Sequence, residues 1–99
     1  MQSEQLHRLE DDVRNALRIV MDPELGINLV DLGMIYMITA HANGDVSVTM
    51  TTTTRGCPAA GFLTQAVQAC VENVAGVFHA DVELTYEPEW SPDMAIPEA

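Results

Sequence analysis

The chain has 99 residues, of which 47% are hydrophobic, and this size suits one domain with a single modest core. Its 15 acidic residues and four arginines give a formal net charge of −11, which disfavours binding to nucleic acid phosphates and to anionic lipid surfaces. It contains no apolar run of about 20 residues, as a membrane span would require, and its polar, acidic start differs from a signal peptide. We therefore expect a cytoplasmic protein, and two cysteines without a disulfide framework fit a reducing compartment.

The first predicted element is an amphipathic helix from about Ser3 to Val20. Its apolar residues recur at steps of three and four, with charged residues between them, which is the pattern of a helix with one buried face. Ser3 suits the N-cap position, and Pro23 ends the helix because its ring and missing N–H cannot continue the hydrogen-bond ladder. The predicted buried face comprises Leu6, Leu9, Val13, Ala16, Leu17 and Val20.

Two strands joined by a tight turn come next. The apolar run from Met34 to Thr39 suits a strand that is buried on both sides. The second strand, which ends at Thr54, alternates between apolar and polar residues, as a strand with one buried face does. The Asn43-Gly44 pair between them predicts a β-hairpin. The buried face of the second strand should carry Val46, Val48, Met50 and Thr52.

The remaining elements are a helix, a strand and an arm. The helix is predicted from about Pro58 to Val74 and is stopped by Gly76, and Val82, Leu84 and Tyr86 then alternate with polar residues as a third strand. The order α-β-β-α-β indicates an α/β (α+β) fold, with one compact domain over residues 1–99, a small three-stranded mixed sheet and helices packed on one face. The crossover through the second helix is expected to be right-handed if its two strands are parallel. Residues 88–99 are expected to form an irregular C-terminal arm.

Cys57 is the residue whose position points most directly to function. It lies where a strand should turn into a helix, because Gly56 permits unusual backbone angles and Pro58 suits the first helical position. The free N–H groups at a helix N-terminus and the nearby Arg55 favour the thiolate, which is the form that binds metal or attacks an electrophile. The alternative is that Cys57 only fills the turn.

Cys70 is a useful internal comparison, because it falls on the apolar stripe of the second helix and is expected to be inert core. The sequence has no CxxC motif, so a self-contained zinc site is not expected. A disulfide between the two cysteines is also disfavoured, because one lies at the start of the helix and the other several turns along it. The stripe consists of Leu63, Ala66, Val67, Cys70 and Val74.

The acidic connection between the first helix and the hairpin is long, and long ordered loops are often functional. Asp22, Glu24 and Asp31 carry oxygen atoms that can accept a metal ion or steer a partner. Asp and Asn also cap turns by bonding their own backbone, and we expect this structural role for Asp22 and Asn28 taken singly. If the loop lay close to Cys57, a metal-binding or partner-binding role would be favoured over turn capping.

Three segments resemble the MIP18 family, formerly a domain of unknown function: DPELGINLVDLGMIY, TMTTTTRGCP and VELTYEPEWSPDM, in this order. The resemblance covers nearly the whole chain after the first helix. It is similar to SufT-like members, to PaaD-like proteins of phenylacetate degradation and to the domain fused to some Mrp-type ATPases. PaaD-like proteins often carry a cysteine-rich C-terminal segment that this sequence lacks, which favours the SufT-like interpretation.

The resemblance implies a maturation factor for iron–sulfur proteins and not an enzyme. Such a factor carries iron or a cluster transiently, or brings the assembly machinery to a recipient apoprotein, and such domains often form dimers. It implies that Cys57 is the functional thiol and metal ligand. Arg55 departs from the family, whose members commonly have proline or a small residue there. The predicted site loop comprises Asp22, Pro23, Glu24, Asn28, Asp31, Thr53, Arg55, Gly56 and Pro58.

Three hypotheses are open at this point. In the first, Cys57 holds iron or a cluster, and a dimer, a partner or a small thiol completes a shell of about four ligands. In the second, the protein is a metal-free adaptor, or a PaaD-like accessory factor for a phenylacetyl-CoA oxygenase complex, and contacts its partner through Glu87 and Trp90. In the third, which the sequence supports least, Cys57 is an enzyme nucleophile with His41 or His79 as its base.

Overall fold

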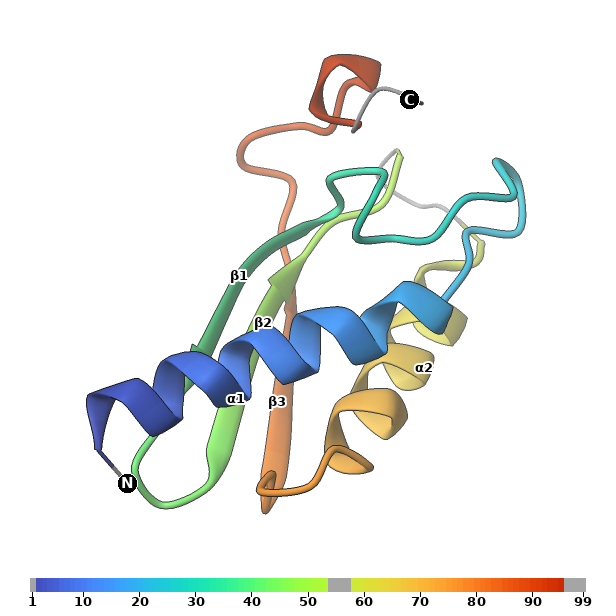
Figure 1. Cartoon of the computed structure of the whole chain (residues 1–99). Helices are drawn as coiled ribbons and strands as arrows, with labels where there is room; N and C mark the ends of the chain where they lie inside the picture. The colour runs from blue at the N-terminus through green and yellow to red at the C-terminus, as the bar shows by residue number, and fades with distance from the viewer. Residues whose placement is uncertain (1, 54–57, 96–99) are drawn as a thin grey trace.

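The computed structural model describes residues 2–53 and 58–95 (Figure 1). The predicted order α-β-β-α-β is confirmed, with a short 3-10 helix added after the first helix and another near the end. The elements are α1 (Ser3–Ala16), η1 (Leu17–Ile19), β1 (Ile35–Ala40), β2 (Asp45–Met50), α2 (Ala60–Glu72), β3 (His79–Leu84) and η2 (Pro92–Met94). Within the described ranges, no helix is both long and apolar enough to cross a membrane.

The three strands form one mixed sheet in the order β1-β2-β3. β1 and β2 form the predicted antiparallel hairpin, and Gly44 in its turn has a φ of 91°, a value that glycine adopts without strain. β2 and β3 are parallel, so a crossover must connect them, and α2 provides it. Both helices pack on one face of the sheet, as predicted (Figure 1), and on the other face Met37, Asp81 and Glu83 are exposed.

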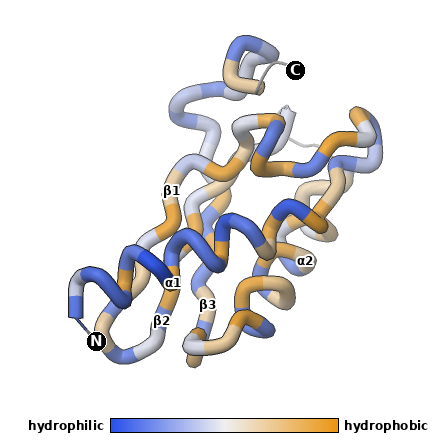
Figure 2. Tube along the Cα trace, in the orientation of Figure 1, coloured by the Kyte–Doolittle hydropathy of each residue, from blue (hydrophilic) through white to orange (hydrophobic). Residues whose placement is uncertain are grey.

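The core lies between the sheet and the two helices. β2 contributes Val46, Val48 and Met50, which alternate with half-buried polar residues as predicted. Hydrophilic and hydrophobic residues alternate along α1 (Figure 2), and its apolar residues Leu9 and Val13 are buried in the core. The predicted stripe of α2 faces the core, but its centre shifts slightly: Leu63 and Val67 are fully buried as predicted, Val71 is also fully buried, and Cys70 is half-buried. The fully buried residues of α2 are Leu63, Val67 and Val71.

Three predictions about the first helix and the hairpin need correction. The N-cap of α1 is Gln2 and not Ser3, and the Gln5 side chain accepts a hydrogen bond from the backbone N–H of Gln2. β1 is not buried on both sides, because Met37 is 59% exposed on the open face of the sheet. β2 ends at Met50, earlier than predicted, although the Thr51 N–H still bonds to the Met34 carbonyl in the register of the Ile35–Met50 pair and Thr51 and Thr52 remain buried.

The later elements are also shorter than predicted. α2 begins at Ala60 with Ala59 as its N-cap, so Pro58 precedes the helix and does not open it. The helix ends at Glu72, before Gly76, whose φ of 96° reverses the chain towards β3. β3 ends at Leu84, and Tyr86 lies beyond it.

The described part of the C-terminal arm packs against the loop before β1. The indole Nε1–H of Trp90 donates to the carbonyl oxygen of Leu32 at 2.6 Å, and the Tyr36 hydroxyl donates to the carbonyl oxygen of Pro88 at 2.8 Å. Burial raises the pKa of the Tyr36 hydroxyl, which keeps it protonated as the donor. Gly33 lies so close to Met94 that an added Cβ would be 2.3 Å from the Met94 carbonyl oxygen. The arm is therefore tied to the body of the protein.

A matched pair of Gly→Ala substitutions in the loop before β1 tests how much the packing of the C-terminal arm contributes to stability. Gly26 and Gly33 both have positive φ values, of 68° and 75°, but a Cβ at Gly26 meets no atom within 4 Å. Both Gly→Ala changes should cost about 1 kcal/mol of unfolding free energy for the left-handed backbone. Gly33→Ala should cost at least about 1 kcal/mol more, because the methyl group displaces Met94.

Urea unfolding followed by circular dichroism measures this difference. Trp90 is the only tryptophan, so its fluorescence reports on the arm directly. Gly33→Ala should shift the emission to longer wavelength in the native state, whereas Gly26→Ala should not. Equal stabilities and equal emission in the two variants would show that the arm does not rest on Gly33.

Candidate functional site

The described residues of the predicted site lie in the connection before β1, just after β2 and just before α2. Cys57, Gly56 and Arg55 lie outside the described residues. Their described neighbours are Thr53, which is half-buried after β2, and Pro58, which is exposed in the turn before α2. The end of β2 is joined to the loop before β1 by the hydrogen bond from Thr51 N–H to the Met34 carbonyl. Two of the three predicted motifs therefore meet here.

Asp22 is 3% exposed and organises the start of the loop. Its Oδ1 accepts hydrogen bonds from the backbone N–H groups of Glu24 and Leu25, at 2.8 and 2.9 Å. Its own carbonyl oxygen accepts from Gly26, which closes a tight turn. Pro23 and Glu24 are exposed on this turn. These hydrogen bonds agree with the structural role that we expected for Asp22.

Asn28 and Asp31 hold the second half of the loop together. The side-chain oxygen of Asn28 accepts from the Asp31 backbone N–H, and its Nδ2 donates to Asp31 Oδ2, both at 2.9 Å. The other oxygen of Asp31 pairs with Arg18 Nη1 at 2.5 Å, across partly exposed surface. The long connection is thus a packed structure and not an open loop, since Leu29 and Leu32 within it are buried.

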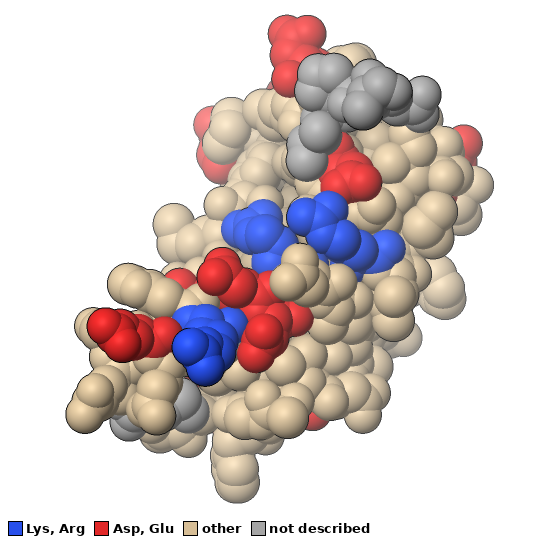
Figure 3. All heavy atoms as spheres, in the orientation of Figure 1, with Lys and Arg blue, Asp and Glu red and all other residues tan. Residues whose placement is uncertain are grey.

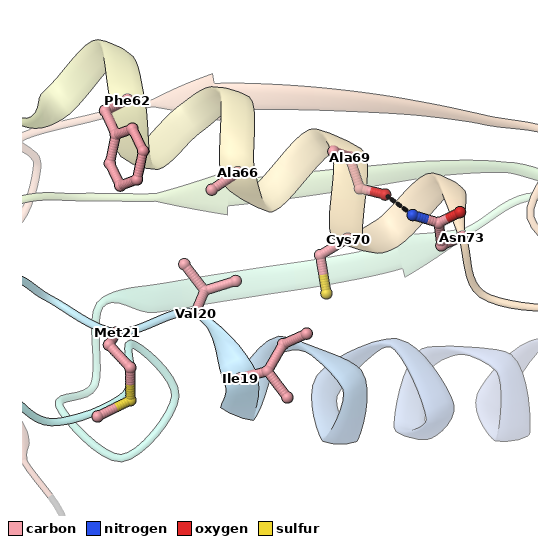
Figure 4. Close-up of a pocket in the computed structure, with 8 residues that line it drawn as sticks. All are labelled: Ile19, Val20, Met21, Phe62, Ala66, Ala69, Cys70 and Asn73. Carbon is pink, nitrogen blue, oxygen red and sulfur yellow. Dashed lines mark hydrogen bonds between the residues drawn. The ribbon is translucent and has the colours of Figure 1, made fainter.

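An open apolar groove of about 470 Å³ lies beside this end of the molecule, between the end of α1 with η1 and α2 (Figure 4). Met21 from the loop and Phe62 from the first turn of α2 both line it. Ile19 and Phe62 on its walls are 76% and 66% exposed. Sequence reasoning missed this groove, because exposed and buried apolar residues look alike in a sequence. Its other lining residues are Val20, Ala66, Ala69, Cys70 and Asn73.

Cys70 lies on the wall of the groove and is half-buried, so it is not the fully buried core residue that was predicted. Its thiol donates to the Ala16 carbonyl at 3.3 Å, which joins α2 to α1. Burial raises the pKa of this thiol. Cys70 is therefore disfavoured as a thiolate, which agrees with the expectation that it is inert.

Charged groups are unevenly placed around the fold. The three arginines of the described residues, Arg8, Arg14 and Arg18, all belong to α1 or η1, and Figure 3 shows basic groups on this face with acidic groups beside them.

Among residues 2–53 and 58–95, no three His, Cys, Asp or Glu side chains are grouped so that they could hold a metal ion.

The two histidines proposed as bases lie at the other end of the sheet. His79 opens β3 beside Glu72 and Asp81, and His41 contacts Ser47 Oγ at 3.2 Å in the hairpin. Asp45 at the start of β2 is paired with His79, so the six residues of β2 separate His79 from the Thr53 end by about 17 Å. This arrangement gives no support to the thiol enzyme hypothesis.

The C-terminal residues predicted as partner contacts have different surroundings. Glu87 is exposed, whereas Trp90 is half-buried through its bond to Leu32 and covers the edge of the core. Between them and the site lies a contact that the sequence did not indicate, in which the Thr52 and Tyr86 hydroxyl oxygens are 2.8 Å apart. It joins the chain after β3 to the end of β2.

Substitutions at Asp22 test whether its side chain stabilises the fold by capping the turn. Asp22→Ala removes the acceptor of two backbone N–H groups and should cost about 1–2 kcal/mol of unfolding free energy. Asp22→Asn keeps one acceptor oxygen and should cost less than half of that. Glu24→Gln, on the exposed side of the same turn, is the control and should be neutral. Urea unfolding measures all three, and equal stability of Asp22→Ala and wild type would contradict the capping role.

The two cysteines can be compared by alkylation at controlled pH. In a Cys57→Ser variant only Cys70 remains, and the folded protein should react with iodoacetamide more slowly at pH 7.5 than the same protein in urea. The reason is that burial raises the thiol pKa and lowers the thiolate fraction, so the folded rate should keep rising as pH increases. Faster reaction in the folded state would show that Cys70 is activated.

Known proteins match this chain in sequence over most of its length. The model of the iron–sulfur cluster assembly protein family matches residues 10–84. A Porphyromonas gingivalis Fe-S protein maturation auxiliary factor is 48% identical over 91% of this chain and 86% of its own length. The Staphylococcus aureus Fe-S protein maturation auxiliary factor SufT is 33% identical over 77% of this chain and 86% of its own.

The fold has a close match among solved structures. The crystal structure of a Bacillus anthracis domain of unknown function, DUF59, superposes with a TM-score of 0.91 at 34% identity, over 95% of this chain and 90% of that one. The matched residues include the DPE loop, both strands of the hairpin and the GCP segment. The predicted resemblance to SufT-like proteins is thereby confirmed, and the chain belongs to the iron–sulfur cluster assembly protein family.

Proposed function

We propose that this protein is a non-enzymatic maturation factor that holds iron or an iron–sulfur cluster transiently through Cys57 and passes it to recipient apoproteins. The observation that carries the proposal is the family match over residues 10–84, which includes the GCP segment. The relatives named as maturation factors match over most of their own length, which supports the same role here. The expected partners are the assembly machinery and its recipients.

The surroundings of the site favour a transient load over a resident one. The acidic loop residues already have internal partners: Asp22 caps a turn, and Asp31 is bonded to Asn28 and Arg18. Cys70 is half-buried and bonded to Ala16. Because iron–sulfur clusters normally have about four protein ligands, a single thiol would need a second copy, a partner or a small thiol to complete the shell. Such shared ligation would let the cargo leave easily.

The apolar groove supports a second candidate function, that of a metal-free adaptor. Ile19, Met21 and Phe62 together expose apolar side chains next to the loop, and exposed apolar surface of this kind often marks a protein contact. An adaptor would use this surface to bring the assembly machinery to a recipient. In this alternative Cys57 would have no metal to bind.

Anaerobic reconstitution with iron and sulfide distinguishes the two candidates. Wild type, Cys57→Ser and Cys70→Ser are treated identically, and visible absorption, iron content and chromatographic mass are measured. The carrier proposal predicts a chromophore in wild type and in Cys70→Ser, with most of the bound iron lost in Cys57→Ser. A load shared between two copies should appear together with a doubled mass.

The control variant makes the result specific to one thiol. Iron retained in full by Cys57→Ser would refute the carrier proposal, and iron lost equally from both variants would point to damage and not to ligation. No iron in any of the three proteins would favour the adaptor. In that case Phe62→Ser should lower the recovery of assembly partners without changing the unfolding free energy by more than about 0.5 kcal/mol, because Phe62 is exposed.

A further inference from the structure

β3 forms one edge of the sheet, and its backbone groups alternate in direction along that edge. The Thr85 N–H donates to the Met50 carbonyl, so in this parallel pair the odd-numbered residues of β3 bond to β2. The even-numbered residues Ala80, Val82 and Leu84 then turn their N–H and C=O groups away from the sheet. These outward groups are the ones that an added strand would use.

Side chains of α2 cover the first part of this edge. The Ala80 N–H donates to Glu72 Oε2 at 3.3 Å, and the Ala80 carbonyl accepts from Gln68 Nε2 at 3.4 Å. Both outward groups of Ala80 are therefore occupied, and Ala80 is fully buried. A strand cannot pair here without first displacing two side chains.

The second part of the edge has no such cover within residues 2–53 and 58–95. One and two turns before Gln68, on the same side of α2, lie Thr64 and Gly61. Thr64 is short, and its hydroxyl donates to the Gly61 carbonyl of its own helix at 3.0 Å. Gly61 has no side chain, and a Cβ added there would meet no atom within 4 Å. Val82 is half-buried and Leu84 is 36% exposed, so this stretch is open to a partner.

The side chains around the open stretch carry negative charge. Asp81 and Glu83 are exposed on the uncovered face of the sheet, and they flank Val82. They stand opposite Ser47 and Thr49 of β2, which are uncharged. A strand added at this edge would therefore place alternate side chains next to two carboxylates, and basic residues at those positions would be favoured.

We propose that the open edge of β3 at Val82–Leu84 binds an extended segment of a partner protein that carries Lys or Arg at every second position. Main-chain hydrogen bonds to Val82 and Leu84 would hold the segment, and Asp81 and Glu83 would select its basic residues. A second copy of β3 is disfavoured as occupant, because it would bring its own Asp81 and Glu83 against these carboxylates. The proposal needs neither iron nor Cys57, so it stands apart from the carrier function.

The test uses the intact protein and a seven-residue peptide of alternating Lys and Val with blocked ends. Hydrogen exchange followed by NMR, with and without saturating peptide, reads the edge residue by residue. Exchange of the Val82 and Leu84 amides should slow at least about tenfold, because each gains a hydrogen bond. The Ala80 amide is the internal control and should not change, because Glu72 already accepts its hydrogen bond.

Two peptide variants separate strand addition from charge attraction alone. One carries N-methyl groups on its Val residues and the other on its Lys residues, and only one of these two sets of amides can face β3. Binding that is lost with one methylated peptide and kept with the other supports the proposal, and the sensitive set gives the strand direction. Binding that neither methylated peptide loses, or that both lose, would overturn it.

Protein variants test the choice of basic residues. Asp81→Asn combined with Glu83→Gln should weaken binding about fivefold, while Asp11→Asn combined with Asp12→Asn, on the exposed side of α1, removes the same charge and should have a smaller effect. Equal weakening by the two pairs would reduce the effect to net charge and overturn the proposal. The proposal would also be overturned if, without peptide, the protection of the Val82 and Leu84 amides from exchange increased with protein concentration. A second copy of the protein would then occupy the edge.

Discussion

The pairing of β2 with both of its neighbours is the constraint on which the rest of the structure depends. β2 is the middle strand, and Val46, Val48 and Met50 turn inward from it to meet both helices. Because β3 runs parallel to β2, the chain must return to the start of the sheet before β3 can form, and α2 makes that return. The ends of β2 and β3, the start of α2 and the loop before β1 therefore share one end of the molecule. That end is where the family motifs fall.

At this end most polar groups are used to hold the chain in place. Asp22 and Asn28 cap consecutive turns, Thr52 meets Tyr86, and Trp90 donates to Leu32. A loop that is bonded internally needs little rearrangement when a partner binds, so less conformational entropy is lost on association. Two of its carboxylates, Asp22 and Asp31, already accept hydrogen bonds. In the proposed function, the chemistry rests on the thiol of Cys57, and the loop provides a fixed surface for a partner.

Much of the fold could be predicted from the sequence because the local signals agree with one another. The period-two pattern of β2, the Asn43-Gly44 turn and the apolar stripe of α1 each indicate their element without knowledge of the others. The errors arose where tertiary contacts decide. β2 stops at Met50 although the alternating pattern runs on to Thr52, and Met37 is exposed although it lies in an apolar run. The DPE and GCP motifs predict a candidate site, but the apolar groove and the uneven cover along β3 depend on how the two helices lie, which no local pattern encodes.

The grouping of the described arginines on α1 and η1 has a consequence for how partners approach. In a chain with a net charge of −11, the three arginines offset most of the four acidic residues of α1, whereas β3 exposes Asp81 and Glu83, so the charge is distributed unevenly, as an electric dipole. A cationic protein that diffuses nearby would exert a torque on this dipole and would meet the β3 side more often than chance allows. This orientation would operate over about 10 Å at 0.1 M salt and would fade as ionic strength rises. Encounter would thus be biased before any contact forms.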